Sequence, residues 1–312
     1  MPAPRGDRVP SAHDGLLGTI GDVALIFEGG GMRASYTAGV VGTLLEQGFD
    51  FADVYGISAG SSHTANYVSR DPLRARAAFT DFVLLPGFGG LGSMLRGTGY
   101  FNGPYLYEGI AEEMAVTGDA LAFKWEAFCA SPAQVHIEAF DWDSGATMRW
   151  TKADMPTMRD LLLRVRASST MPLFMPPTTI GDRTYMDGGL GSSWGLPLCS
   201  AQADGYERFF IVRTQPRGCR KTPMGRAAQM AFRLLFRRHP RVAEATIARW
   251  QHYNALLDEV EDLERQGAAY VFYPESMMVT NRTTDHSALC ASYDAGYAQA
   301  QREIKAWERF LR

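Results

Sequence analysis

The sequence has few cysteines, no long hydrophobic segment and almost no excess of charge of one sign. Its 312 residues include 4 cysteines, at positions 129, 199, 219 and 290, and no two of them form a C-x-x-C pair. This pattern argues against a zinc site and against a secreted disulfide scaffold, and it favours reduced thiols in a cytoplasmic protein. Lys plus Arg number 31 and Asp plus Glu 34, which gives a net charge of −3. This balance gives no reason to expect nucleic-acid binding.

The sequence also contains no segment that would place it in a membrane. No apolar run reaches the roughly 18 residues that a membrane-spanning helix needs. Residues 82–95 are uncharged, but they contain Pro86 and several glycines, a composition typical of a loop. Residues 1–14 are polar and Pro-rich and hold no signal-peptide core. We therefore expect a flexible segment at 1–20 and a cytoplasmic location.

The hydrophobic pattern predicts alternating strands and helices. Residues 23–27 form a short apolar run typical of a buried parallel strand, and residues 33–46 carry apolar side chains at helical spacing before Gly48. Residues 51–57 predict a second strand, and a helix is expected from Ala59. This alternation is typical of an α/β domain with a mainly parallel central sheet and helices on both faces.

The rest of the chain continues this pattern without an evident break. Further strands are expected at 133–140, 147–150, 184–186, 209–212 and 269–273, and helices around 161–165, 226–265 and 294–310. No internal repeat or low-complexity linker interrupts them. We expect a single domain at 21–312, with a core at about 21–215 and a mainly helical C-terminal extension at about 216–312. Residues 81–102 are Gly-rich and irregular, which is typical of a functional loop.

A G-x-S-x-G motif lies between the second predicted strand and the helix that follows it. It reads Gly56-Ile-Ser58-Ala-Gly60, and this context is the one that a nucleophile elbow requires. Gly56 and Gly60 permit a tight turn, and the amides at the start of the helix, Ala59 first, favour negative charge at the Ser58 hydroxyl. The motif alone arises by chance, so its place after a strand carries the inference. His63, one turn further on, is expected to pack in the interior.

A glycine-rich turn follows the first predicted strand. Gly29, Gly30 and Gly31 offer amides without side chains, and this turn should face Ser58, because adjacent parallel strands end on the same edge of a sheet. Together with Ala59 the turn is a candidate oxyanion hole for acyl chemistry. Arg33, in the same turn, is expected to orient the loop or to bind a phosphate, the alternative being a surface arginine.

The same glycines also fit a dinucleotide-binding fingerprint. Residues 29–34 match G-x-G-x-x-A, a pattern that needs an acidic residue at the end of the second strand to hold a ribose hydroxyl. Here the second strand ends at Tyr55 and Gly56, and Asp50 and Asp53 lie at its start. Nucleotide binding is therefore the disfavoured alternative.

Acyl transfer at Ser58 needs a general base, and two residues are candidates. His286 lies far downstream, as in α/β-hydrolases, but those enzymes build several strands before their serine and only one is predicted here. Asp187 ends a predicted strand and precedes Gly188 and Gly189, so its carboxylate can approach another backbone closely. An ordinary Asp, with a pKa near 3.9, is a weak base, so Asp187 would need a dry site. Asp-Gly-Gly is also common in hairpin turns.

Together these motifs resemble the patatin-like phospholipase family over residues 22–215. The match consists of Glu28-Gly-Gly-Gly-Met-Arg33, Gly56-Ile-Ser58-Ala-Gly60 and Ala167-Ser-Ser-Thr-Met-Pro172 leading to Tyr185-Met-Asp187-Gly188-Gly189. The resemblance implies a three-layer α/β/α fold and a Ser58–Asp187 dyad without histidine, with the oxyanion held by residues 29–33. It also implies hydrolysis of lipid acyl esters, with no cofactor and no metal. The alternative function is a non-catalytic module that binds a lipid or a nucleotide.

The resemblance extends in part to the C-terminal region. Tyr253-Asn254 and Tyr293-Asp-Ala-Gly-Tyr297 are similar to a bacterial branch of the family that carries a helical extension. After the Asp-Gly-Gly motif the family often continues with Asn-Pro, whereas this chain has Leu190-Gly-Ser-Ser-Trp194-Gly-Leu-Pro197. Trp194 is therefore expected to reshape the rim of the pocket, and the substrate class follows less directly than the dyad.

A basic segment at 217–249 bears on partners other than the lipid ester. It holds nine Lys or Arg residues against one acid, Glu244, and Phe232, Leu234, Leu235 and Phe236 lie among them. A basic helix with apolar side chains can lie on an anionic membrane surface, which predicts peripheral membrane contact. The alternative is that its arginines pair with the acidic run at 258–262 inside the folded domain.

Overall fold

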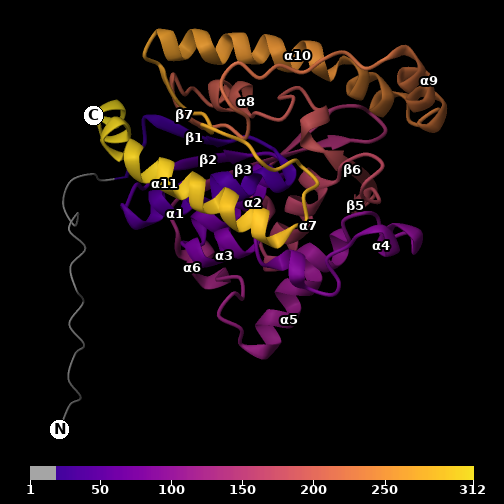
Figure 1. Ribbon diagram of the computed structural model, residues 1–312, viewed down its shortest axis with the longest axis horizontal. Helices are drawn as coiled ribbons and strands as arrows, with labels where there is room; N and C mark the ends of the chain where they lie inside the picture. Colours follow the sequence, from indigo (N-terminus) through magenta and orange to yellow (C-terminus); the bar gives the residue numbers. More distant parts are fainter. Residues whose placement is uncertain (1–18) are drawn as a thin grey trace.

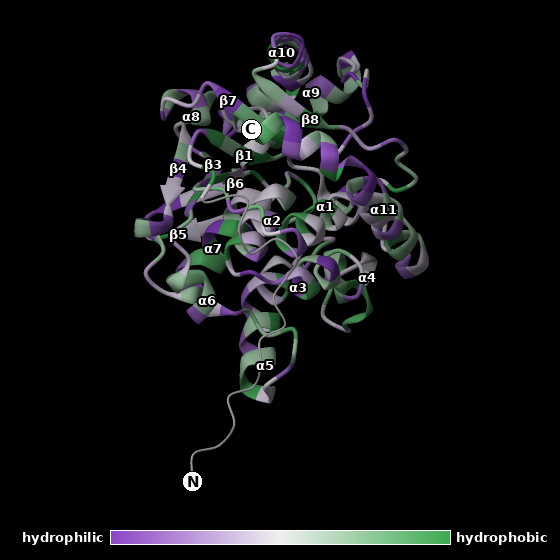
Figure 2. Ribbon diagram, turned by 90° about the vertical axis from the view of Figure 1, so that its left-hand side faces the viewer, coloured by the Kyte–Doolittle hydropathy of each residue, from purple (hydrophilic) through white to green (hydrophobic). Residues whose placement is uncertain are grey.

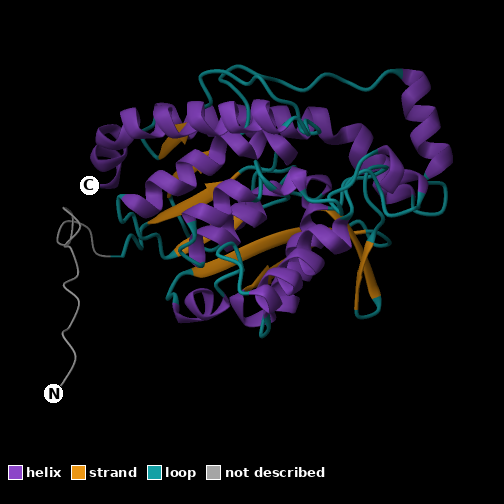
Figure 3. Cartoon of the chain, turned by 60° about the horizontal axis from the view of Figure 1, so that its bottom comes forward, coloured by secondary structure: helices purple, strands orange, loops and turns teal. Residues whose placement is uncertain are grey.

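A sheet of eight strands runs through the centre of the molecule, with helices on both sides of it (Figures 1 and 3). The structure is a computed structural model that describes residues 19–312. The strands are β1 (Val23–Phe27), β2 (Asp53–Gly56), β3 (Gln134–Asp141), β4 (Thr147–Thr151), β5 (Thr178–Ile180), β6 (Arg183–Asp187), β7 (Arg208–Val212) and β8 (Ala269–Phe272). The helices are α1 (Ala34–Glu46), α2 (Ala59–Val68), α3 (Pro72–Ala77), α4 (Leu91–Leu95), α5 (Ile110–Thr117), α6 (Trp125–Ala130), α7 (Met158–Ser169), α8 (Leu198–Ala203), α9 (Arg226–Leu235), α10 (Pro240–Arg265) and α11 (His286–Leu311).

The sheet is mostly parallel, and helices cover both of its faces. Strands β3, β2, β1, β7 and β8 lie side by side in that order and run parallel. Their side chains alternate between two apolar layers, and Figure 2 colours these strands largely as hydrophobic. In β1, Leu25 and Phe27 pack in the layer that includes α1, while Ala24 and Ile26 pack in the layer that includes α8 and α10. The predicted three-layer α/β/α fold is confirmed.

Strands β2 and β6 pair with the same side of β3, one after the other along its length. Gly56, the last residue of β2, pairs with Ile137, and Asp187, the last residue of β6, pairs with Ala139. Strand β4 pairs with β3 across both of these positions. Because β4 occupies one side of β3, β2 and β6 must share the other side. The end of β6 therefore meets the end of β2.

Most predicted elements occur, with shifted bounds. The second strand is shorter than expected, and the last helix begins at His286 rather than near residue 294. Residues 81–102 are not wholly irregular, because they hold a 3-10 turn at Phe82–Leu84 and helix α4. The C-terminal extension also contributes β8, which pairs with β7.

Two expectations concern the N-terminus and the membrane. Ile20 of the segment expected to be flexible forms a parallel bridge with Phe51, and residues 1–18 of that segment lie outside the described residues. None of the helices within 19–312 combines the length and the apolar character needed to cross a bilayer.

Candidate active site

Ser58 occupies a strained turn between β2 and α2. Its backbone has φ 57° and ψ −126°, a conformation that residues other than glycine rarely adopt. The turn is possible because glycines flank it: a Cβ on Gly60 would collide with the carbonyl of Phe27, and one on Gly56 with the backbone of Gly60. The amide of Ser58 donates to the hydroxyl of Ser168 at 2.9 Å. This geometry matches the nucleophile elbow that the sequence predicts.

Asp187 faces Ser58 from the end of β6. Both residues line one polar cavity, each is 7% exposed, and the Ser58 hydroxyl is near enough to the Asp187 carboxylate to influence its pKa. The amide of Gly189 donates to Asp187 Oδ1 at 2.7 Å, and a Cβ on Gly188 would collide with the backbone of β3. Burial raises the pKa of Asp187 above its usual range, although Arg249 and the hydrogen bonds act in the opposite direction. The carboxylate is thus more basic than that of an exposed aspartate.

The glycine-rich turn after β1 lies against the elbow, but not all of its amides are available to a substrate. The amide of Gly29 donates to the carbonyl of Gly195 at 2.9 Å, and that of Arg33 donates to the carbonyl of Gly30 at 3.3 Å. Among residues 19–312 no group accepts from the other predicted donors. The candidate oxyanion donors are thereby narrowed to the amides of Gly30, Gly31 and Ala59.

Two cavities of different character meet at Ser58. One has a volume of about 110 Å³ and is lined mainly by apolar side chains, including Phe82, Phe88 and Phe101 from the segment 81–102. The other has a volume of about 190 Å³ and is lined by charged and polar groups. Ser58 therefore lies where an apolar chain and a polar group of one ligand would join.

The polar cavity contains basic residues that the sequence placed elsewhere. Lys221 and Arg249 were assigned to a basic surface segment, but both line this cavity with Arg33, which is not a surface arginine. Burial lowers the pKa of Arg33, and burial together with nearby Arg249 lowers the pKa of Lys221 to about 8. No local pattern distinguishes Lys221 and Arg249 from their basic neighbours, so sequence reasoning missed them. Tyr253 of α10 also lines the cavity.

An ion pair between Glu28 and Arg213 forms part of the wall of the same cavity. Arg213 Nε donates to Glu28 Oε2 at 2.9 Å, and both side chains are 2% exposed. The amide of Thr214 donates to Glu28 at 2.7 Å, and the Tyr253 hydroxyl donates to it as well. Burial alone would raise the pKa of Glu28, but Arg213 and these donors hold it below its usual range. Glu28 is therefore fully engaged by its own partners.

The histidines considered from the sequence do not line either cavity. His286 Nε2 lies 2.9 Å from Asp81 Oδ1, and with Cys290 these residues form a partly exposed group that could hold a metal ion. His63 is fully buried and contacts the Thr37 hydroxyl at 2.9 Å. Burial lowers the pKa of His63 to about 3. The prediction that His63 is a packing residue is confirmed.

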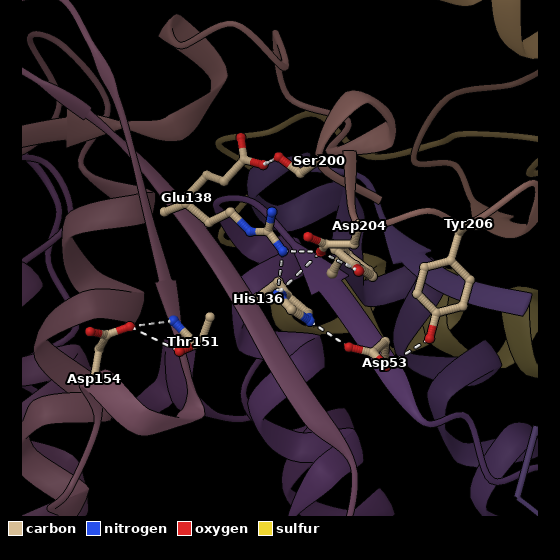
Figure 4. A network of polar contacts seen from close by, with 10 residues as sticks. Asp53, His136, Glu138, Thr151, Asp154, Ser200, Asp204 and Tyr206 are labelled. Carbon is tan, nitrogen blue, oxygen red and sulfur yellow. Dashed lines mark hydrogen bonds and ion pairs between the residues drawn. The ribbon is translucent and has the colours of Figure 1, made fainter. Parts of the chain in front are cut away.

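A second cluster of ionisable side chains lies at the other end of the sheet (Figure 4). His136 Nε2 lies 2.6 Å from Asp53 Oδ1, and the Tyr206 hydroxyl donates to the same carboxylate at 2.7 Å. Arg149 pairs with Asp204 and contacts His136 Nδ1 at 2.8 Å. Each ionisable side chain named here has a hydrogen-bond or ion-pair partner within the cluster, so we interpret it as a structural network that joins β2, β3 and β4.

Three of the nine basic residues of this segment form ion pairs within the described chain, and one of them, Arg220, meets the acidic run at 258–262 that the alternative interpretation names. Arg217 pairs with Glu264 at 2.7 Å, and Arg220 pairs with Asp258 at 3.0 Å, both acids lying on α10. Helix α9 differs, because none of its residues is buried and it exposes the apolar side chains of Met230, Leu234 and Leu235. It lies at the outer edge of the molecule, beside the start of α10 (Figure 1).

Trp194, expected at the rim of the pocket, stacks on His252 of α10 with ring centroids 4.4 Å apart. Its backbone has φ 50°, and its carbonyl accepts from Arg249 at 3.4 Å. The following residue, Gly195, lines the polar cavity. Trp194 therefore helps to hold Arg249 at the edge of that cavity.

Several known proteins and families are similar to this chain. The profile of the family described as Patatin-like phospholipase matches residues 25–198, and a domain of unknown function (DUF6363) matches residues 239–312. Uncharacterized protein YjjU of Escherichia coli (strain K12) is 27% identical over 205 residues, 65% of this chain and 55% of the relative. The chain thus spans little more than half of that relative's length. VipD from Legionella pneumophila superimposes with a TM-score of 0.48 and 13% identity, covering 91% of this chain and 67% of VipD.

The first of these matches covers more than half of the chain and includes the glycine-rich turn, the elbow and Asp187. The chain therefore belongs to the patatin-like phospholipase family, whose members act on lipid substrates.

Proposed function

We propose that this chain is a serine hydrolase of fatty-acyl esters, with Ser58 as the nucleophile and Asp187 as the general base. One observation carries the proposal: Ser58, on a strained turn, lines the same cavity as a buried carboxylate whose pKa is raised by burial, at the junction of the two cavities. A serine is a weak nucleophile unless a neighbouring base accepts its proton. The raised pKa brings Asp187 closer to the basicity that this task requires.

In the proposed reaction the Ser58 Oγ attacks the acyl carbonyl carbon while Asp187 accepts the hydroxyl proton. The negative oxygen of the tetrahedral intermediate accepts hydrogen bonds from the amides of Gly30, Gly31 and Ala59. Collapse of the intermediate expels the alcohol, which leaves with the proton from Asp187. A water molecule then attacks the acyl-enzyme, Asp187 accepts its proton, and the fatty acid is released with Ser58 restored.

The apolar cavity is the proposed site of the acyl chain. Three of its aromatic side chains, those of Phe82, Phe88 and Phe101, come from the segment 81–102, and α7 contributes Leu162 and Val165. Burying an apolar chain there contributes about 0.8 kcal/mol per methylene group. The proposed groups all belong to the chain, so we expect hydrolysis without a metal or a cofactor and without inhibition by EDTA.

We also propose that the exposed face of α9 contacts an anionic membrane. Its apolar residues lie among Arg226, Arg233 and, just beyond the helix, Arg237, and the segment 217–243 holds no acid to balance them. A groove beside α9 is lined by Leu235 and by Met175, a residue that also lines the apolar cavity. Apolar side chains among arginines match a surface of acyl chains and anionic headgroups.

The test of the catalytic proposal is hydrolysis of a short p-nitrophenyl ester. Ser58→Ala should abolish turnover and His286→Ala should not. A fluorophosphonate probe separates a hydrolase from a non-catalytic binding module, because only an activated serine reacts with it. Labelling of the wild type that Ser58→Ala removes would support the hydrolase. Full activity of Ser58→Ala would refute it.

A further inference from the structure

The polar cavity holds more positive charge than its own acids can balance. Arg33, Lys221 and Arg249 line it, together with two acids, Glu28 and Asp187. Glu28 is engaged by Arg213, which leaves Asp187 as the one lining acid without a paired cation. Within residues 19–312 none of the three lining cations has a carboxylate within salt-bridge distance. The cavity is therefore electrostatically incomplete.

Two of these cations each have one buried side-chain nitrogen without a hydrogen-bond partner among the described residues. Arg33 Nε and Arg249 Nε are both shielded from solvent, and neither finds an acceptor within the described part of the chain. The Lys221 ammonium group lies 4.2 Å from the centroid of the Tyr253 ring, which supplies no full negative charge. Leaving a charged donor buried without an acceptor costs folding free energy. Such a cost is common at binding sites whose ligand supplies the missing group.

Neighbouring residues position the backbone of Lys221 and the guanidinium group of Arg249. Asn254 of α10 accepts from the amide of Lys221 at 2.9 Å and donates to its carbonyl at 2.9 Å. Arg249 donates to the carbonyl of Trp194 at 3.4 Å, and Trp194 is itself stacked on α10. A pre-positioned set of cations binds an anion with little loss of side-chain entropy.

From these observations we infer that the polar cavity binds a phosphate monoester group on the alcohol half of the ester substrate, an inference that rests on the proposed function. The substrate class is then an acylglycerol phosphate: its acyl chain enters the apolar cavity, its ester lies at Ser58, and its phosphate meets Arg33, Lys221 and Arg249. A phosphate offers several acceptor oxygens and up to two negative charges, which match three cationic donors. A choline headgroup would add a positive charge to a cavity that already holds three cations. Glu28 could not balance that charge, because it is already paired with Arg213.

The inference gives the C-terminal part of the chain a role in the site. Arg249 and Tyr253 lie on α10, and Asn281 of the following loop also lines the cavity. All three fall within 239–312, the range that matches the domain of unknown function, and outside the range that matches the phospholipase family. Residues 25–198 would supply the elbow and the base, and residues 239–312 would supply part of the headgroup site.

The experiment compares three esters with the same acyl chain: a monoacylglycerol phosphate, a monoacylglycerol and a monoacyl glycerophosphocholine. The full chain should show the highest kcat/KM on the phosphate monoester. The preference for the phosphate monoester is the ratio of its kcat/KM to that of the neutral ester. Lys221→Gln and Arg249→Gln should each lower this preference about tenfold, mainly by raising KM for the phosphate monoester. The reason is that each variant removes a charged hydrogen bond. Arg265→Gln is the matched control, because it removes the same charge from an exposed position on α10.

A separate binding measurement distinguishes failure of this inference from failure of the proposed function. Calorimetry with glycerol 3-phosphate and the Ser58→Ala variant should detect binding that Lys221→Gln removes and Lys221→Arg restores. Binding without hydrolysis of any ester would support the phosphate site and contradict the hydrolase. Hydrolysis with equal kcat/KM on all three esters, or equal loss on all of them in the variants, would overturn the phosphate site. Thermal unfolding of each variant shows whether it is folded.

Discussion

The amide of Ser58 donates to the hydroxyl of Ser168 on α7 at 2.9 Å. That hydroxyl donates in turn to the carbonyl of Glu138 on β3 at 2.6 Å. Strand β3 also pairs with Asp187 through Ala139. The backbone of the elbow and the residue proposed as its base are therefore tied to neighbouring positions of one strand, which fixes the distance between them.

Replacing Ser168 should weaken this connection. Ser168→Ala leaves the Ser58 amide and the Glu138 carbonyl buried without their shared partner, and leaving such groups unsatisfied costs about 1–3 kcal/mol. We expect a lower Tm and a lower kcat on a short ester. Ser287→Ala is the control, because it removes a hydroxyl from the exposed start of α11. A Ser168→Ala variant with wild-type Tm and kcat would show that the bond does not hold the elbow.

The substitution Asp187→Asn should affect activity and stability in opposite directions. The pKa of Asp187 is raised by burial, so the folded state binds this proton more tightly than the unfolded state does. At pH 7 the charged carboxylate therefore lowers the free energy of unfolding. Asn removes the charge and keeps an oxygen that can accept from Gly189. We expect loss of hydrolysis together with a higher Tm, measured in the same preparation; a lower Tm would contradict the account of the pKa.

The pH dependence of the wild type follows from the same shift. Asp187 must be ionised to accept the Ser58 proton, so kcat/KM should fall as the pH drops through the pKa of Asp187 in the free protein. Because burial raises that pKa above 3.8, the acid limb should lie above the range of an ordinary aspartate. The measurement is a pH profile of kcat/KM on an uncharged ester. A profile that stays flat down to the usual aspartate pKa would exclude Asp187 as the base.

The parts of the site that local sequence determines could be predicted. The strand at 23–27, the glycine-rich turn and the elbow each depend on neighbouring residues: an apolar run, glycines where backbones approach, and a helix that starts at Ala59. The meeting of Ser58 and Asp187 is different. It depends on β2 and β6 sharing one side of β3, a register between distant segments that no local pattern encodes. For that pairing the sequence offered only a family resemblance.

The basic segment at 217–249 also shows that local sequence does not predict the environment of each side chain. Charge and hydrophobicity alone assign its arginines to one class, yet Arg217 pairs with Glu264, Arg249 lines the polar cavity and Arg233 lies on exposed α9. Which of these environments each arginine enters depends on how α10 crosses the sheet. The packing of α10 against β8 and α8 sets that crossing, and the residues near each arginine do not.

Close backbone contact makes Gly60 a sensitive position of the elbow. A Cβ at Gly60 would collide with the carbonyl of Phe27 on β1, and backbone cannot move aside as a flexible side chain can. We expect Gly60→Ala to lower the free energy of unfolding by about 1–3 kcal/mol or more and to abolish hydrolysis. Gly21→Ala, where nothing lies within 4 Å of an added Cβ, is the control. Measured by denaturant unfolding, equal stability of the two variants would contradict the tight turn.

The proposed membrane contact predicts a specific loss of vesicle binding. Met230, Leu234 and Leu235 are 70%, 68% and 61% exposed, so polar replacements there should leave the folded core intact. Inserting one such leucine into a bilayer contributes about 1.5–3 kcal/mol, so Leu234→Gln should weaken binding to anionic vesicles about tenfold or more. Arg233→Gln should weaken it less, because a surface arginine contributes about 1 kcal/mol.

Co-sedimentation with vesicles of defined anionic-lipid content measures this binding, and added salt should weaken it in the wild type by screening the arginines. Leu73→Gln is the matched control, since Leu73 is 61% exposed on α3, away from α9 (Figure 1). Retained hydrolysis of a short soluble ester reports that the active site of each variant is intact. Equal binding of the Leu234→Gln and Leu73→Gln variants would show that α9 does not enter the membrane. Binding that is indifferent to both anionic lipid and salt would remove the role of the arginines, because charge attraction at a membrane surface falls off within a Debye length.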